Sequence, residues 1–154
     1  MSFEIEKPLD RTDWAILGEL QNDARLSYQQ LGRRVGLSGP ATGERVRRLE
    51  AAGVITGYQA EVSPAKTGYP IVAFVRMACT GAVCIRTAYT PDGFPEVLEL
   101  HRVSGTDCSL LKVVASSVGH LEELLDRLAR YGQPTTSLAL SSVVQRGPVP
   151  SRLP

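Results

Sequence analysis

The chain has 154 residues, 17 basic against 16 acidic, for a net charge of +1, with 43% hydrophobic and 21% charged residues. This composition is typical of a globular protein with one medium domain or two small ones, and it argues against a disordered or fibrous chain. The balanced total charge by itself indicates no polyanionic partner. A membrane helix would need ~18 consecutive apolar residues, and no run approaches that length.

Targeting and redox signals are weak. Residues 1–7 lack the basic start and apolar core of a signal peptide, so a cytoplasmic protein without a membrane partner is expected. The three cysteines, Cys79, Cys84 and Cys108, are odd in number and lack the spacing of metal ligands. We therefore expect reduced thiols and no metal site. We also expect no resident cofactor, although a small-molecule effector is possible.

Capping signals predict two helices in the first part of the chain. Asp10, with Asp13 three residues later, begins an amphipathic segment of about three turns that closes at residues 22–23. Ser27 and Gln30 form a capping box for a second, short helix that ends at Gly36.

The third predicted helix is the most informative segment. It begins at Ser38, about three residues after the second helix, and Gly53 closes it. At 100° per residue Thr42, Val46 and Leu49 share one narrow apolar face. The opposite face carries Pro40, Glu44, Arg47 and Arg48. Two short helices joined by a tight turn with glycine are typical of a helix-turn-helix, whose second helix enters the major groove of DNA.

The charge of this region supports a DNA-binding function. Between Arg25 and Arg48 there are six arginines and one acid, Glu44. Such a basic patch is typical of a nucleic-acid binder, although a solvated helical face is the alternative. Arg45 either contacts phosphate or forms an internal ion pair, and Gly43 either permits close approach to DNA or is a tolerated substitution. The candidate DNA-binding residues are Arg25, Ser27, Arg34, Ser38, Gly39, Pro40, Thr42, Gly43, Glu44, Arg45, Arg47 and Arg48.

The second half of the chain follows a different pattern. Residues 54–62 suggest a strand or wing, and proline and glycine mark a linker up to residue 70. Strands are predicted at 71–77, 97–103, 108–115 and 135–144, with a helix capped by Ser117 and running to Tyr131; 81–95 is only a weak helix. The order βαββαβ is the ferredoxin-like unit. We therefore expect an α+β protein: a helix-turn-helix domain at 1–57, a strand and linker at 58–70, and a ferredoxin-like domain at 71–154.

The predicted strands also indicate an assembly. Segments 71–75 and 110–115 are apolar on both faces, whereas two helices cover only one face of a four-stranded sheet. A two-fold dimer through the sheet would bury the other face, and would present two helices about one turn of DNA, ~34 Å, apart.

The chain resembles the Lrp/AsnC family of regulators over nearly its whole length. The resemblance rests on Leu9-Asp10, Ile16-Leu17, Arg25-Leu26-Ser27, Val35-Gly36-Leu37-Ser38, Arg45-Val46-Arg47-Arg48-Leu49-Glu50, Gly53-Val54-Ile55-Thr56-Gly57-Tyr58, Val103-Ser104-Gly105, Leu110-Leu111-Lys112-Val113 and Thr135-Thr136-Ser137. It implies a helix-turn-helix joined to a ferredoxin-like effector domain, dimers that assemble further up to octamers, and an amino acid or related effector. The implied effector-binding residues are Gly105, Thr106, Asp107, Cys108, Thr136 and Ser137. Cys108 stands where the family usually has aspartate, which puts the usual amino-acid ligand in question.

The function expected is therefore a sequence-specific transcriptional regulator that binds double-stranded DNA and responds to a small molecule. One alternative is an architectural DNA-binding protein of low specificity without an effector. The other is an enzyme or metabolic-control subunit, against which stands the lack of a convergent acid, base and nucleophile set.

Overall fold

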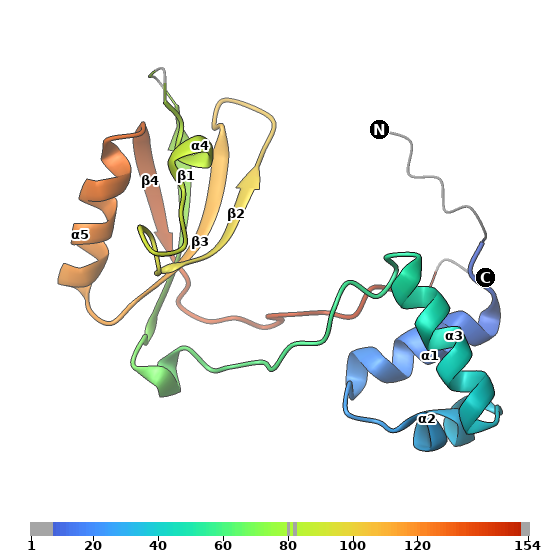
Figure 1. The fold of residues 1–154 in the computed structure, drawn as a ribbon. Coiled ribbons are helices and arrows are strands. Elements are labelled where there is room, and N and C mark those ends of the chain that lie inside the picture. Colours follow the sequence, from blue (N-terminus) through green and yellow to red (C-terminus); the bar gives the residue numbers. More distant parts are fainter. Residues whose placement is uncertain (1–7, 80, 82, 152–154) are drawn as a thin grey trace. The chain divides into compact units, whose positions relative to one another are not determined.

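The computed structural model describes residues 8–79, 81 and 83–151. The chain divides into two compact units. The first comprises residues 8–60 together with 144–151, and the second comprises residues 61–143 (Figure 1). From the sequence, residues 144–151 are expected in the second domain, whereas in the structure they group with the first unit. None of the described helices has the length and hydropathy needed to cross a membrane.

Three helices build the first unit: α1 (Arg11–Asn22), α2 (Tyr28–Val35) and α3 (Gly39–Ala51). The capping boxes predicted at Asp10 and Ser27 are both present, and Ser38 accepts from the N–H of Ala41 at the start of α3. Gly36 ends α2 in the left-handed conformation, at φ 74°. The three predicted helices are thus confirmed.

The α2–α3 turn depends on a close helix crossing. Ile16, Leu31, Val46 and Leu49 form the core of the unit. A Cβ on Gly32 would lie 2.6 Å from the carbonyl oxygen of Leu37, so only glycine fits at this crossing. The short turn then fixes the direction in which α3 leaves α2.

The strand or wing predicted at 54–62 is wrong. Val54 and Ile55 pack against the helical core, and both of their N–H groups donate to the carbonyl oxygen of Leu49. Among the described residues, 56–62 have no strand partner, so their backbone groups cannot form a ladder. Residues 144–151 also belong to this unit and contact α1. There the side-chain carbonyl oxygen of Gln21 accepts from the N–H of Val149 at 2.7 Å.

The second unit is a four-stranded antiparallel sheet with helices. Its elements are η1 (Ala65–Thr67), β1 (Ile71–Ala78), α4 (Ile85–Ala88), β2 (Val97–Arg102), β3 (Ser109–Ala115), α5 (Val118–Ala129) and β4 (Gln133–Leu138). The strand order β2-β3-β1-β4 confirms the predicted βαββαβ arrangement. The last strand ends at Leu138, which pairs with Ala73 of β1, well before the predicted end at residue 144.

The two faces of this sheet differ. Ala73, Val75 and Met77 of β1 are buried in a core with Leu124 and Leu128 of α5, and Figure 1 shows α5 along one side of the sheet. On the other face, Phe74 is 40% exposed. We call this the open face; it carries Val72, Phe74 and Arg76 of β1 with the residues paired to them, Leu110, Lys112, Val114, Thr135 and Ser137.

Candidate nucleic-acid interface and effector region

The outer side of α3 presents Arg47 to solvent. Pro40, Glu44 and Arg47 are all exposed, as predicted from the helical spacing. Arg47 Nη2 donates to Glu44 Oε2 at 2.8 Å, yet the two side chains remain 63% and 75% exposed. This hydrogen bond raises the pKa of Arg47, which keeps the guanidinium charged. The pair is a surface contact that a phosphate or a base edge can replace.

Two other arginines of α3 are held by α1. Asp13, whose side chain is 3% exposed, accepts from Arg45 Nη1 at 2.9 Å and from Arg48 Nη2 at 2.8 Å. Arg45 also donates to Asp10 at 2.7 Å, which lowers the pKa of Asp10. The open question about Arg45 is thus answered by an internal ion pair. Arg48 is exposed, as predicted, with its side chain 47% exposed, although its guanidinium also pairs with Asp13.

Two predicted DNA contacts are corrected. Thr42 is fully buried and its hydroxyl donates to the carbonyl oxygen of Ser38 at 2.9 Å, so the side chain cannot reach DNA. Gly43 is buried under Tyr28, because a Cβ there would lie 2.9 Å from the ring. Gly43 therefore serves the packing of α2 on α3, not the approach of α3 to DNA.

The remaining predicted residues lie at the starts of α2 and α3, or elsewhere on the surface of the unit. Ser27 and Ser38 are exposed caps at the starts of α2 and α3. Gly39 packs over the backbone of Gln29. Arg25 is exposed, whereas Arg34 Nη1 pairs with Glu19 at 2.7 Å.

Sequence reasoning missed two residues at this surface. Tyr28 is 44% exposed and covers Gly43, so its phenol lies where α2 meets the outer part of α3. One feature of the sequence could have pointed to Tyr28, namely its position directly after the capping Ser27. Asp13 was read only as a cap, but its carboxylate positions Arg45 and Arg48.

The effector residues implied by the family resemblance are only partly brought together. Gly105 and Thr106 lie in an exposed loop. Asp107 Oδ2 lies 3.9 Å from Nε of Arg76, a residue that sequence reasoning missed although it is a lone charge in an apolar strand. Ser137 pairs with Phe74 and lies on the open face, on the same side as Arg76. Thr136 pairs with the buried Val75 and therefore lies on the other face, away from Ser137.

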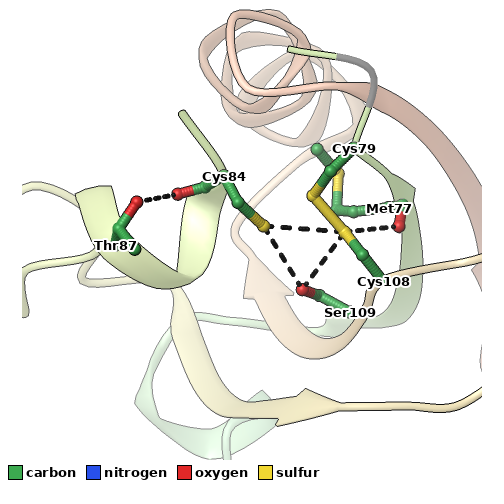
Figure 2. Close-up of a disulfide and its surroundings, with 6 residues drawn as sticks. All are labelled: Met77, Cys79, Cys84, Thr87, Cys108 and Ser109. Carbon is green, nitrogen blue, oxygen red and sulfur yellow. Dashed lines mark hydrogen bonds between the residues drawn. A yellow bond between two sulfur atoms is a disulfide. The ribbon is translucent and has the colours of Figure 1, made fainter. Parts of the chain in front are cut away.

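Cys108 is bonded to Cys79 in a disulfide, which corrects the expectation of three reduced thiols. Figure 2 shows that the free thiol of Cys84 lies beside this bond, with its Sγ 3.6 Å from that of Cys108. A separate cavity of about 370 Å³ contains none of the predicted effector residues and is lined by Gly81, Ala129, Arg130, Tyr131, Gly132, Gln133 and Pro134.

Comparison with known proteins agrees with both units. Residues 9–50 match the model of the AsnC-type helix-turn-helix domain, and residues 72–149 match that of the Lrp/AsnC ligand binding domain. The chain is 42% identical over 134 residues to the uncharacterized HTH-type transcriptional regulator YezC of Bacillus subtilis, covering 87% of this chain and 95% of that protein. It is 39% identical over 128 residues to the leucine-responsive regulatory protein of Rhizobium meliloti, covering 79% and 80% of the two chains.

Solved structures give the same result. The structure of B. subtilis LrpC has a TM-score of 0.84 at 33% identity and covers 91% of this chain and 100% of that one. The transcriptional regulator NMB0573 of Neisseria meningitidis, solved as an L-Met complex, also has a TM-score of 0.84, at 29% identity, and covers 93% and 97%.

Proposed function

The chain belongs to the Lrp/AsnC family of transcriptional regulators, and from this premise we propose that Arg47 on the exposed side of α3 reads operator DNA in the major groove. The observation that carries the proposal is the contrast between the arginines of α3. Arg45 and Arg48 hold α3 against Asp13, while Arg47 projects into solvent.

The chemistry fits groove recognition. A guanidinium can donate to O6 and N7 of guanine together, a contact worth about 1–3 kcal/mol of discrimination. Glu44 accepts from Arg47 in the free protein and orients it until a base edge replaces the carboxylate. At the start of α3, the capping Ser38 and the first free amides favour a phosphate oxygen. Arg25 adds a further positive charge near the backbone of the duplex.

Sequence specificity is tested with DNA from upstream of the protein's own gene. Fluorescence anisotropy at fixed salt should give a dissociation constant at least about 1,000-fold tighter for this duplex than for a shuffled duplex of equal length. A ratio near one would instead support the low-specificity architectural alternative.

We also propose that the second unit binds an amino acid or related metabolite, acting on DNA binding in the cytoplasm. Arg76 and Asp107 offer opposite charges, which suit the carboxylate and the ammonium group of a free amino acid. The L-Met complex of the Neisseria regulator supports this ligand class. A thermal-shift screen of the twenty common amino acids should find at least one that raises the Tm, and a smaller shift in Asp107→Asn. No response to any of them would reject this effector class and leave DNA binding untouched.

The open face supports a homodimer, and further assembly up to an octamer would build on it. Phe74 lies on β1, one of the two inner strands of the sheet, and is 40% exposed there. Burying it against a second copy would also supply the two α3 helices needed for a two-fold operator. Light scattering should show Phe74→Lys as a smaller species than the unchanged chain. Val118→Lys, at a position 62% exposed on α5, is the matched control and should not alter the mass.

A further inference from the structure

All three cysteines of the chain meet at one place, although their sequence spacing gave no sign of it. Cys79 follows β1, Cys84 precedes α4, and Cys108 precedes β3 (Figure 2). Their sulfur atoms all lie within 4.8 Å of one another. The spacing of the cysteines along the chain did not indicate that the three sulfurs come together.

The backbone fixes the positions of these sulfurs. The N–H of Cys108 donates to the carbonyl oxygen of Met77 at 2.8 Å, which ties it to the end of β1. The carbonyl oxygen of Cys84 accepts from Thr87 Oγ1 at 2.8 Å in the single turn of α4. The buried hydroxyl of Ser109 lies 3.6 Å from the Cys108 sulfur and 4.0 Å from the Cys84 sulfur. Three chain segments thus hold three sulfurs around one point.

A disulfide explains the proximity of two of these sulfurs but not of the third. Zinc–sulfur bonds of about 2.3 Å in a tetrahedral site place the ligand sulfurs about 3.8 Å apart. The separation of 3.6 Å between Cys84 and Cys108 is close to that value. All three side chains are partly exposed, which gives an ion an entry path and leaves room for water as a fourth ligand.

We propose that Cys79, Cys84 and Cys108 form a three-thiolate site for a thiophilic cation, with Zn²⁺ as the reference ion, when the Cys79–Cys108 bond is reduced. Thiolates are soft ligands that select zinc and copper(I) over magnesium or calcium. The site does not depend on the identity of an amino-acid effector or on DNA recognition.

The chemistry balances with a dithiol reductant. The dithiol gives two electrons and two protons to the Cys79–Cys108 disulfide, which becomes two thiols, and the reductant itself becomes a disulfide. Zn²⁺ then replaces the protons of the three thiols, which pass to solvent. Oxidation removes two of the three sulfur ligands, so the disulfide and the metal exclude each other. The site would therefore be occupied only under reducing conditions.

The test is a zinc titration of the full chain after reduction and removal of metal, in competition with a chromophoric chelator. The reduced chain should bind one Zn²⁺ per chain, and Cd²⁺ should give a thiolate charge-transfer band in the ultraviolet. Cys84→Ser keeps the Cys79–Cys108 pair and should weaken Zn²⁺ binding at least about 100-fold, more than the loss of an outer-shell partner. The oxidised chain should bind no Zn²⁺ at the same concentrations.

Three results would overturn the proposal: no binding by the reduced chain, equal affinity of Cys84→Ser, or equal affinity of the oxidised chain. Circular dichroism of Cys84→Ser, compared with the unchanged chain, shows that a loss of binding is not a loss of fold. DNA binding is measured separately on the metal-free protein, so a failed zinc site does not affect the assigned function.

Discussion

Replacing Asp13 with asparagine should unfold the DNA-binding unit more easily, because Asp13 is the anionic centre that joins α1 to α3. Its carboxylate accepts from Arg45 and Arg48 and also from the N–H of Asp10. Asparagine keeps the shape and one acceptor oxygen but turns an amide toward two guanidinium groups. The matched control Asp23→Asn changes an exposed aspartate of the same unit.

The magnitude follows from the burial of the partners. Charge-assisted hydrogen bonds contribute about 1.5–3 kcal/mol each, and breaking a fully buried pair costs about 3–5 kcal/mol. Here the arginine side chains are 28% and 47% exposed, so they can turn into water. We therefore expect the free energy of unfolding to fall by about 2–3 kcal/mol, below the value for a fully buried pair.

Trp14 makes this measurement specific to the first unit, because it is the only tryptophan of the chain and lies on α1. Its fluorescence in a urea titration should show the midpoint of Asp13→Asn lowered by about 1–2 M. Asp23→Asn should stay within about 0.5 kcal/mol of the unchanged chain. A double-mutant cycle with Arg45→Ala should give a coupling of about 0.5–3 kcal/mol. Equal midpoints for Asp13→Asn and Asp23→Asn would refute the role given to the ion cluster.

The same fluorescence assay tests two further expectations. Gly32→Ala should lose about 1–3 kcal/mol from overpacking, because its Cβ would lie 2.6 Å from the Leu37 carbonyl oxygen. Gly18→Ala in α1, with nothing within 4 Å, should instead gain up to about 1 kcal/mol, and a loss at Gly18 as large as at Gly32 would contradict the crossing argument. The hydrogen bond from Arg45 lowers the pKa of Asp10, so its contribution to stability is complete above about pH 4 and is lost as the pH falls through the lower folded pKa. In Asp10→Asn the urea midpoint should therefore decrease less steeply below about pH 4 than in the unchanged chain. The same pH dependence of the midpoint in both chains would count against the pairing of Asp10 with Arg45.

Local signals predicted the helices well, because a cap acts within a few residues. Asp10 and Ser27 each bond to a residue three positions away, so sequence spacing alone carries the information. The βαββαβ order of the second unit could also be predicted, because its strands and helices follow one another along the chain.

Contacts distant in sequence could not be predicted in the same way. Asp13 and Arg48 are 35 residues apart, and nothing in the pattern of α3 shows that Arg48 turns to α1 while Arg47 does not. The sulfurs of Cys84 and Cys108 meet across 24 residues only after β3 has paired with β1. The strand expected at 54–62 is absent for a related reason. Its residues suit a strand, but among the described residues no other strand pairs with them.

The affinity of Arg47→Ala for operator DNA tests the central claim most directly. The duplex is the footprinted site upstream of the protein's own gene, and Arg130→Ala, which removes the same charge from the end of α5, is the control. Loss of one bidentate base contact should weaken binding about 5- to 150-fold at fixed salt, while Arg130→Ala binds as the unchanged chain does. Equal affinities for Arg47→Ala and the unchanged chain would contradict the claim that this face of α3 reads DNA.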